Sequence, residues 1–260
     1  MADPQDHYYI AQGDGRYHPT EHAQGAWQPE EQHMAPMSGL LMHALERHGP
    51  RPELQWGRVT FDILGMIHLS ETTVRTRTLR PGRTIELVEA TASAGGRDVV
   101  RATAWRLAQA ATESVDTAPV MELPGPETLE RWEGMDHWGG GFIRSLDFRA
   151  VPGGGPGARS VWVGTDHPLV AGEDSTALAA WVGLLDTANG IAIREDPQKW
   201  LFPNVDLTLH LHRQPTGGWL GLSTEVTWGP SGLGQSSSVA HDLRGPVGTV
   251  QQALTIRPRG

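Results

Sequence analysis

Three polar residues in the C-terminal part of the chain have the types needed to hold a water molecule against an ester. Asp186 falls on an expected helix, and Asn204 and Gln251 fall on expected strands that follow it. A carboxylate can accept a proton from water, and a side-chain amide can both donate and accept a hydrogen bond. If the fold brings these side chains together, they could direct a water molecule at an acyl carbonyl.

The spacing around Asp186 predicts an inward-pointing carboxylate. Asp186 shares a helical row with Ala179 and Val182, so it should face the interface between helix and sheet. It also lies in the C-terminal half of the expected helix, where the helix dipole disfavours an anion. Two alternatives stay open: Asp186 could be a solvated helix-surface residue, and Gln251 an ordinary polar residue on a wet strand face.

A second row of polar residues offers different chemistry. Period-two alternation places it on the same strand face as Asn204. The row consists of Asp206, Thr208, His210 and His212. A His-x-His pair near an Asp can bind zinc, but no third strong ligand follows at a suitable spacing. A polar sheet face is favoured, and no metal site is predicted.

Two units with the same order of elements must position these residues. Each has a short candidate strand, then a helix, then four long strands. In the first unit we expect a strand near 16–27, a helix at 36–48 and strands at 55–69, 71–79, 83–93 and 98–108. In the second we expect a strand near 142–150, a helix from Asp174 to about Gly190 and strands at 204–213, 219–227, 235–242 and 248–257.

The sequence therefore predicts an α+β fold of two tandem units. The units are residues 1–110 and residues 139–260, and the segment 111–138 between them is rich in Pro, Glu, Thr and Gly and is expected to be a surface linker. In each unit an antiparallel sheet should wrap round one long helix, and joining the two sheets edge to edge would cover an exposed edge on each.

Composition excludes several classes of protein. The chain has 260 residues, a net charge of −9 and no cysteine. Without cysteine there are no disulfides, thiolate nucleophiles or iron–sulfur ligands. The negative charge argues against a general nucleic-acid binder. No apolar run of about 20 residues could cross a bilayer, and no secretory signal is readable, so we expect a cytoplasmic protein that does not insert into membranes.

Several segments in the same order point to a known family. In the first unit they are Tyr17–Thr20, Trp27, QHMAPMSGLLMHALE and LRPGRTIELVEATASAGGRDVVRATA. In the second they are LVAGEDSTALAAWVGLLDTANG, LFPNVDLTLHLHR, GGWLGLSTE, HDLRGPVG and TVQQALTIRP. This set spans nearly the whole chain and resembles the double-hotdog acyl-CoA thioesterases of type II, especially the actinobacterial thioesterase-like proteins of that superfamily.

The resemblance implies roles for the three polar residues. In that family an Asp on the second helix, a Thr or Ser on the next strand and a Gln on the last strand hold the hydrolytic water. Matching the motifs implies Asp186 as general base, with Gln251 and Asn204 orienting the water. Asn204 replaces the family's hydroxyl residue, although an amide can still hydrogen-bond to water.

The start of the first helix also departs from the family pattern. Relatives often have His-Gly-Gly-Pro where this chain has His-Met-Ala-Pro at 33–36. Substrate contacts are predicted for His33, Ala35, Met37 and Ser38. Backbone N–H groups around Ala35 to Ser38, where the first helix opens, could stabilise negative charge on the carbonyl oxygen. For His33, a surface or capping role stays open.

The resemblance implies a hydrolase of acyl-CoA or acyl-carrier-protein thioesters that needs no cofactor. A rival interpretation keeps the fold without hydrolysis: an acyl-binding or biosynthetic protein that catalyses dehydration or cyclisation. A third is a structural module that assembles through sheet edges. Edge pairing also predicts a homo-oligomer.

Overall fold

The computed structural model describes residues 3–118 and 123–260. The first half of the chain contains β1 (Tyr9–Gly13), β2 (Arg16–Pro19), α1 (Met34–Arg47), β3 (Leu54–Ile63), β4 (Thr72–Arg80), β5 (Ile85–Ala94) and β6 (Arg97–Ala108). The second half contains α2 (Gly141–Arg144), β7 (Leu146–Ala150), β8 (Ala158–Thr165), β9 (Val170–Ala171), α3 (Ala177–Val182), α4 (Ala188–Ile191), β10 (Trp200–Leu201), β11 (Asp206–Leu211), β12 (Leu220–Trp228), β13 (Leu233–Asp242), β14 (Gly245–Thr255) and β15 (Arg257–Pro258). None of the helices in these ranges has the length and apolar character needed to span a membrane.

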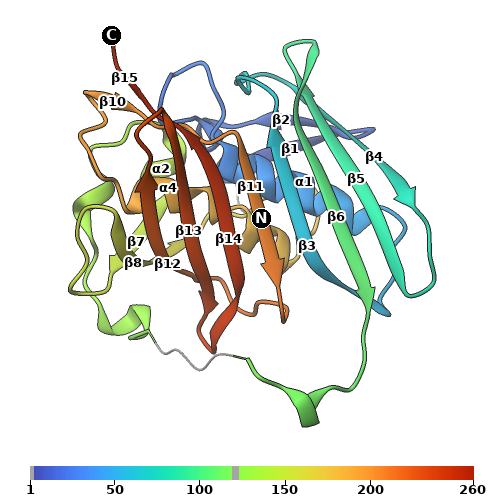
Figure 1. The fold of residues 1–260 in the computed structure, drawn as a ribbon. Coiled ribbons are helices and arrows are strands. Elements are labelled where there is room, and N and C mark those ends of the chain that lie inside the picture. The colour runs from blue at the N-terminus through green and yellow to red at the C-terminus, as the bar shows by residue number, and fades with distance from the viewer. Residues whose placement is uncertain (1–2, 119–122) are drawn as a thin grey trace.

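The large sheet repeats one strand order in both halves. Within the described residues it has 13 strands in the order β7-β8-β12-β13-β14-β11-β3-β6-β5-β4-β2-β1-β9. Numbering the four long strands that follow the helix in each half, the order outward from the centre is first, fourth, third and second, and then two strands that precede the helix. The short strand β9, from the second half, joins the outer edge beside β1. The innermost strands β11 and β3 are antiparallel neighbours, with Thr208 opposite Thr60. Figure 1 shows this junction near the middle of the sheet, with the helices behind it.

Helix α1 is buried along most of its length because the sheet covers one side and α3 covers another. It packs against β4, β5 and β6. The helix begins at Met34, two residues before the expected start, because His33 is the N-cap and its Nδ1 accepts a 3.0 Å hydrogen bond from the backbone N–H of Ala35. Proline is tolerated in the first turn because the N–H groups there have no partner within the helix.

The two halves also meet where α1 crosses α3. A Cβ atom on Gly39 would lie 2.9 Å from Gly183 Cα and 3.0 Å from the carbonyl oxygen of Ala179. Glycine at these two positions therefore permits close backbone contact. Next to the crossing, Ser38 Oγ lies 2.9 Å from the carbonyl oxygen of Val182. Near the other end of α1, His43 Nε2 lies 2.7 Å from Glu173 Oε2, just before α3 begins.

The second helix is not continuous, which corrects the prediction of one helix from Asp174 to about Gly190. Thr176 is the N-cap, α3 ends at Val182, and a 3-10 turn at Leu185–Thr187 leads into α4. The break falls at Gly183, where a residue of low helix propensity coincides with the close contact with α1.

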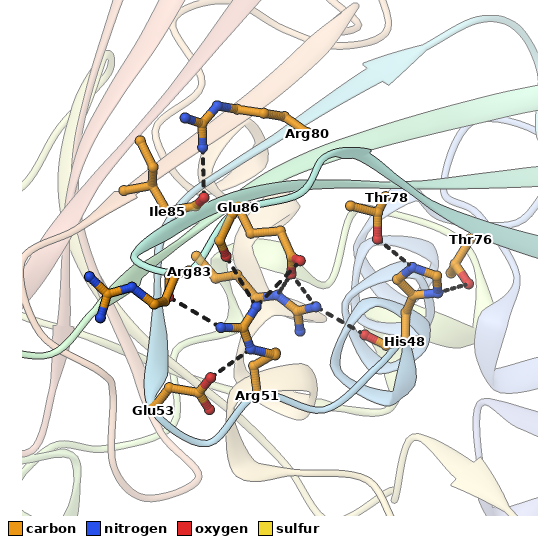
Figure 2. Close-up of polar contacts among 11 residues, drawn as sticks. His48, Arg51, Glu53, Thr76, Thr78, Arg80, Arg83, Ile85 and Glu86 are labelled. Carbon is orange, nitrogen blue, oxygen red and sulfur yellow. Dashed lines mark hydrogen bonds and ion pairs between the residues drawn. The ribbon is translucent and has the colours of Figure 1, made fainter.

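A buried ionic cluster fixes the C-terminal end of α1 to the sheet (Figure 2). Arg106 and Glu86, both nearly inaccessible to solvent, form an ion pair. Arg106 Nη2 also donates a 3.3 Å hydrogen bond to the carbonyl oxygen of His48, the C-cap of α1. Arg51 approaches the other carboxylate oxygen of Glu86 at 3.6 Å. Loss of one partner would leave a buried charge uncompensated, so the cluster holds the helix end firmly.

Part of the segment 111–138, which was expected to be a surface linker, is exposed: residues 111–118 lie at the surface. Residues 119–122 of this segment lie outside the described residues. Beyond them the chain packs against the second half: Met135 is buried, and Trp162 Nε1 donates a 2.7 Å hydrogen bond to the carbonyl oxygen of Pro124. The strands β1, β8, β9 and β10 were absent from the sequence-based prediction.

Candidate active site

A cleft of about 550 Å³ opens between the two halves of the protein. Its lining includes His33 and Met34 at the start of α1, Ile63 at the end of β3, and Asp186 and Asn204 from the second half. A recess of about 40 Å³ adjoins it and shares Asp186, Asn204 and His33 with the cleft. This cleft therefore contains the carboxylate that the sequence singled out.

Two amide groups hold one oxygen of Asp186. Asn204 Nδ2 and Gln252 Nε2 each donate a 2.8 Å hydrogen bond to Asp186 Oδ1. Oδ2 receives no hydrogen bond from the described part of the chain, and its near polar neighbour is His33 Nδ1 at 3.7 Å. One carboxylate oxygen is thus fixed, and the other is available to a ligand or water.

The amide partner on the last strand is Gln252, not Gln251, and this corrects the prediction. Side chains alternate between the two sheet faces along β14. Val250, Gln252 and Leu254 are buried on the helix side, whereas Gln251 is exposed on the outer face and donates a 2.7 Å hydrogen bond to Ser237 Oγ. In the sequence, Gln252 lies two residues from each of the apolar residues Val250 and Leu254, so it shares their strand face. This spacing was the signal that could have selected Gln252.

Each amide is fixed in one orientation by a second contact. Ser236 Oγ donates to Gln252 Oε1 at 2.5 Å, so the amide nitrogen of Gln252 must face Asp186. Asn204 Nδ2 makes a second bond, of 3.0 Å, to the carbonyl oxygen of Asp206. Both N–H groups of Asn204 are therefore used, and its Oδ1 is the atom left to accept a hydrogen bond from a ligand.

Burial sets the protonation of Asp186. Desolvation raises the pKa of Asp186 to about 7, although the hydrogen bonds from Asn204 and Gln252 act in the lowering direction. A carboxyl group with this pKa exchanges its proton near neutral pH. It can therefore act as a base in one step and return the proton in a later one.

His33 is a neutral neighbour of Asp186. Burial lowers the pKa of His33 to about 3, so the ring carries no charge near neutral pH. Its Nδ1 accepts the N–H of Ala35, which assigns the ring proton to Nε2. The 3.7 Å contact with Asp186 is therefore not an ion pair.

The other residues expected to contact substrate are turned away from the cleft. Ala35, Met37 and Ser38 are fully buried. The N–H of Ala35 is taken by His33, and Ser38 Oγ is within 2.7 Å of the Ala35 carbonyl oxygen. Met34 lines the cleft in their place. Only His33 of the four predicted residues lies at the cleft, since the deeper positions of α1 face the core.

The polar row on β11 does not gather round a metal position. His210 is exposed, and His212 Nε2 lies 3.2 Å from the carbonyl oxygen of Pro246. Asp206 Oδ1 accepts a 2.6 Å hydrogen bond from the backbone N–H of Ala253. Among residues 3–118 and 123–260, no three His, Asp or Glu side chains are arranged to hold a metal ion.

Family models match both halves of the chain. Residues 23–107 match the acyl-CoA thioesterase N-terminal domain, and residues 121–256 match the acyl-CoA thioesterase C-terminal domain. The chain belongs to the acyl-CoA thioesterase family. It is a thioesterase.

Solved structures support the hotdog fold of this thioesterase. A hotdog protein of unknown function from Alicyclobacillus acidocaldarius aligns with a TM-score of 0.75 at 14% identity, over 100% of this chain and 99% of that one. An acyl-CoA thioesterase II of Mycobacterium marinum gives 0.68 at 16%, over 100% and 98%. A tesB protein of Mycobacterium avium subspecies paratuberculosis gives 0.69 at 18%, over 96% of each chain. No curated protein matches the chain.

Proposed function

We propose that this thioesterase hydrolyses acyl-CoA, or the thioester of an acyl carrier protein, with Asp186 as general base. The observation that carries the proposal is the carboxylate of Asp186 at the cleft. Its Oδ1 is fixed by Asn204 and Gln252, and its Oδ2 is left for water. No cofactor takes part in this mechanism.

The water molecule would donate one hydrogen bond to Asp186 Oδ2 and a second to Asn204 Oδ1. Its lone pair then attacks the thioester carbonyl carbon as Asp186 takes the proton. Collapse of the tetrahedral intermediate breaks the C–S bond, and Asp186 returns the proton to the leaving thiolate. The products are a carboxylic acid and a free thiol. Asn204 can orient water through its oxygen, so an amide serves where relatives have a hydroxyl.

Negative charge on the carbonyl oxygen would be stabilised at the start of α1. Met34, the first residue of the helix, lines the cleft, and no hydrogen bond of its backbone N–H is found within the described residues. An N–H at a helix N-terminus is aligned with the positive end of the helix dipole. This replaces the predicted donor segment from Ala35 to Ser38.

The proposed architecture is a double hotdog with its site between two tandem units, at residues 1–110 and 139–260. The shared strand order of the two halves supports it, as do the two family models, which match on either side of residues 108–120. A site between the units is supported by one contact: His33 from the first half lies beside Asp186 from the second.

The decisive experiment measures free thiol released from a panel of acyl-CoAs. Wild type should release thiol, and Asp186→Asn should not, because an amide cannot take the proton. The variant keeps an oxygen to accept the bonds from Asn204 and Gln252, and circular dichroism should show that it is folded. Wild-type turnover by Asp186→Asn would refute the general-base role.

Dehydration of a 3-hydroxyacyl thioester is a second candidate. It needs a base for the proton beside the carbonyl and an acid for the departing hydroxyl, and the 3.7 Å between His33 and Asp186 favours such a pair. Against it, Nδ1 of His33 is occupied by the Ala35 N–H. Incubation with 3-hydroxyacyl-CoA separates the two: enoyl-CoA formation supports dehydration, and thiol release supports hydrolysis.

A further inference from the structure

Two arginines that line the cleft come from one extended segment at the C-terminal end of the sequence. Arg257 begins β15 and Arg259 follows it two residues later, and both line the cleft that contains Asp186. In an extended chain, residues two apart point to the same face. Pairing of β15 with β10 holds this segment in place, through Leu201 opposite Arg257. Figure 1 shows β10 and β15 side by side near the C-terminus.

Neither arginine is neutralised by an acid in the described part of the chain. The polar side-chain contact of Arg257 is a weak 3.4 Å bond from Nη1 to Thr255 Oγ1. The guanidinium of Arg259 lies 5.9 Å from the centre of the Trp27 ring, a cation–π contact that holds it over the cleft. Two unpaired cations in one cleft are notable in a chain with a net charge of −9.

Besides Asp186, the cleft has one further lining carboxylate, and it has other partners. Glu31 lines the same space, but its Oε1 accepts the backbone N–H groups of Trp27 and Gln28 at 3.0 and 3.1 Å. Burial raises the pKa of Glu31. Both arginines therefore keep their donors available to an anionic ligand.

We propose that Arg257 and Arg259 bind phosphate on the carrier of the acyl group, either the phosphate of the phosphopantetheine arm or the nucleotide phosphates of CoA. The proposal rests on the proposed function, because the thioester must reach Asp186 through the same cleft. Guanidinium groups bind phosphate through paired N–H donors. A phosphopantetheine phosphate is shared by CoA and acyl carrier proteins, whereas CoA adds the phosphates of its nucleotide.

The test uses one acyl group on three carriers: CoA, phosphopantetheine and pantetheine, which lacks phosphate. For Arg257→Gln/Arg259→Gln we expect KM for acyl-CoA to rise about tenfold or more, with kcat near wild type. KM for acyl-pantetheine should not change. Equal losses on acyl-pantetheine, or an unchanged KM for acyl-CoA, would overturn the proposal.

Arg83→Gln is the matched control for charge. Arg83 is exposed, Figure 2 shows its guanidinium without a partner among the residues drawn, and it lies at the end of the strands opposite to the cleft. This variant should leave KM for acyl-CoA unchanged. If it raises KM as much as Arg257→Gln or Arg259→Gln does alone, the effect is one of overall charge and not of a phosphate site.

The position of the phosphate is given by comparing KM for two carriers. Equal KM increases for acyl-CoA and acyl-phosphopantetheine assign the arginines to the shared phosphate, and an increase for acyl-CoA alone assigns them to the nucleotide phosphates.

A binding experiment separates the phosphate site from hydrolysis. Calorimetric titration of CoA into Asp186→Asn, with and without the arginine changes, measures binding without turnover. Loss of CoA binding only when the arginines are absent supports the site even if hydrolysis is refuted, and equal binding overturns it.

Discussion

Gln252 Nε2 donates a 2.8 Å hydrogen bond to Asp186 Oδ1, across the junction between the last long strand and the interrupted second helix. Because Ser236 fixes the orientation of the amide, this bond favours the ionised form of a carboxylate that burial holds near neutral pKa. The protonation of Asp186 therefore depends on the register of β14, which decides which glutamine faces it.

Replacing Gln252 should therefore lower activity by changing the protonation of Asp186. In Gln252→Met one donor to the carboxylate is lost, so the pKa of Asp186 rises further and less base is present at pH 7. We expect kcat/KM at pH 7 to fall about tenfold, with the acidic limb of the pH profile moved to higher pH. Gln251→Met, one residue away on the outer face, should leave both unchanged; equal losses in the two variants would contradict this assignment.

The same pair of glutamines shows how far the sequence can predict the site. Helical spacing predicted the inward-pointing carboxylate of Asp186, and residue alternation predicted the four long strands of each unit, because both patterns are local. A shift of one residue along a strand reverses the face of a side chain, so two adjacent glutamines could be separated only through the burial of Val250 and Leu254. The break after Val182 falls at Gly183, a poor helix former, but the sequence does not show that this glycine lies against α1.

Thioester hydrolysis should depend on pH through Asp186. The base must be ionised, and its pKa is raised to about 7. We expect kcat/KM to increase with pH through a midpoint near 7 and then level off. The profile is measured with a substrate that has no group titrating in this range. A limb near pH 4 would show that Asp186 titrates as an ordinary exposed carboxyl group.

Stability should change with pH in the opposite direction. The folded protein keeps the proton of Asp186 up to about pH 7, whereas the unfolded chain releases it near the ordinary value of 3.8. Between these values unfolding releases a proton, so this residue makes the folded state less stable as pH rises. Asp186→Asn should remove the penalty, on the order of 4 kcal/mol at pH 8 and little at pH 4. Urea unfolding of both proteins at the two pH values checks it; a constant difference would contradict it.

The crossing of α1 and α3 should tolerate no added methyl group. In Gly39→Ala the new Cβ would overlap Gly183 and the Ala179 carbonyl. Alanine normally stabilises a helix by about 1 kcal/mol over glycine, but overpacking of backbone costs about 1–3 kcal/mol. We expect a net loss of about 1 kcal/mol in the free energy of unfolding, together with reduced kcat as His33 and Asp186 separate.

Gly155 provides the comparison for that change. A Cβ there would meet no atom within 4 Å, so Gly155→Ala should affect neither unfolding nor turnover. If Gly39→Ala unfolds at the same urea concentration as wild type and is fully active, the close crossing does not set the distance between the two halves of the site.

The contact between His43 and Glu173 has a consequence for stoichiometry. The crossing of α1 and α3 has two similar corners. At the first, His33 at the start of α1 meets Asp186 beyond α3. At the second, His43 in the later part of α1 meets Glu173 just before α3. The first corner leaves a carboxylate oxygen of Asp186 free, whereas the 2.7 Å contact of His43 with Glu173 fills the second. One corner is therefore open to a ligand and the other is closed by a side-chain contact, so we expect each chain to bind a single acyl carrier.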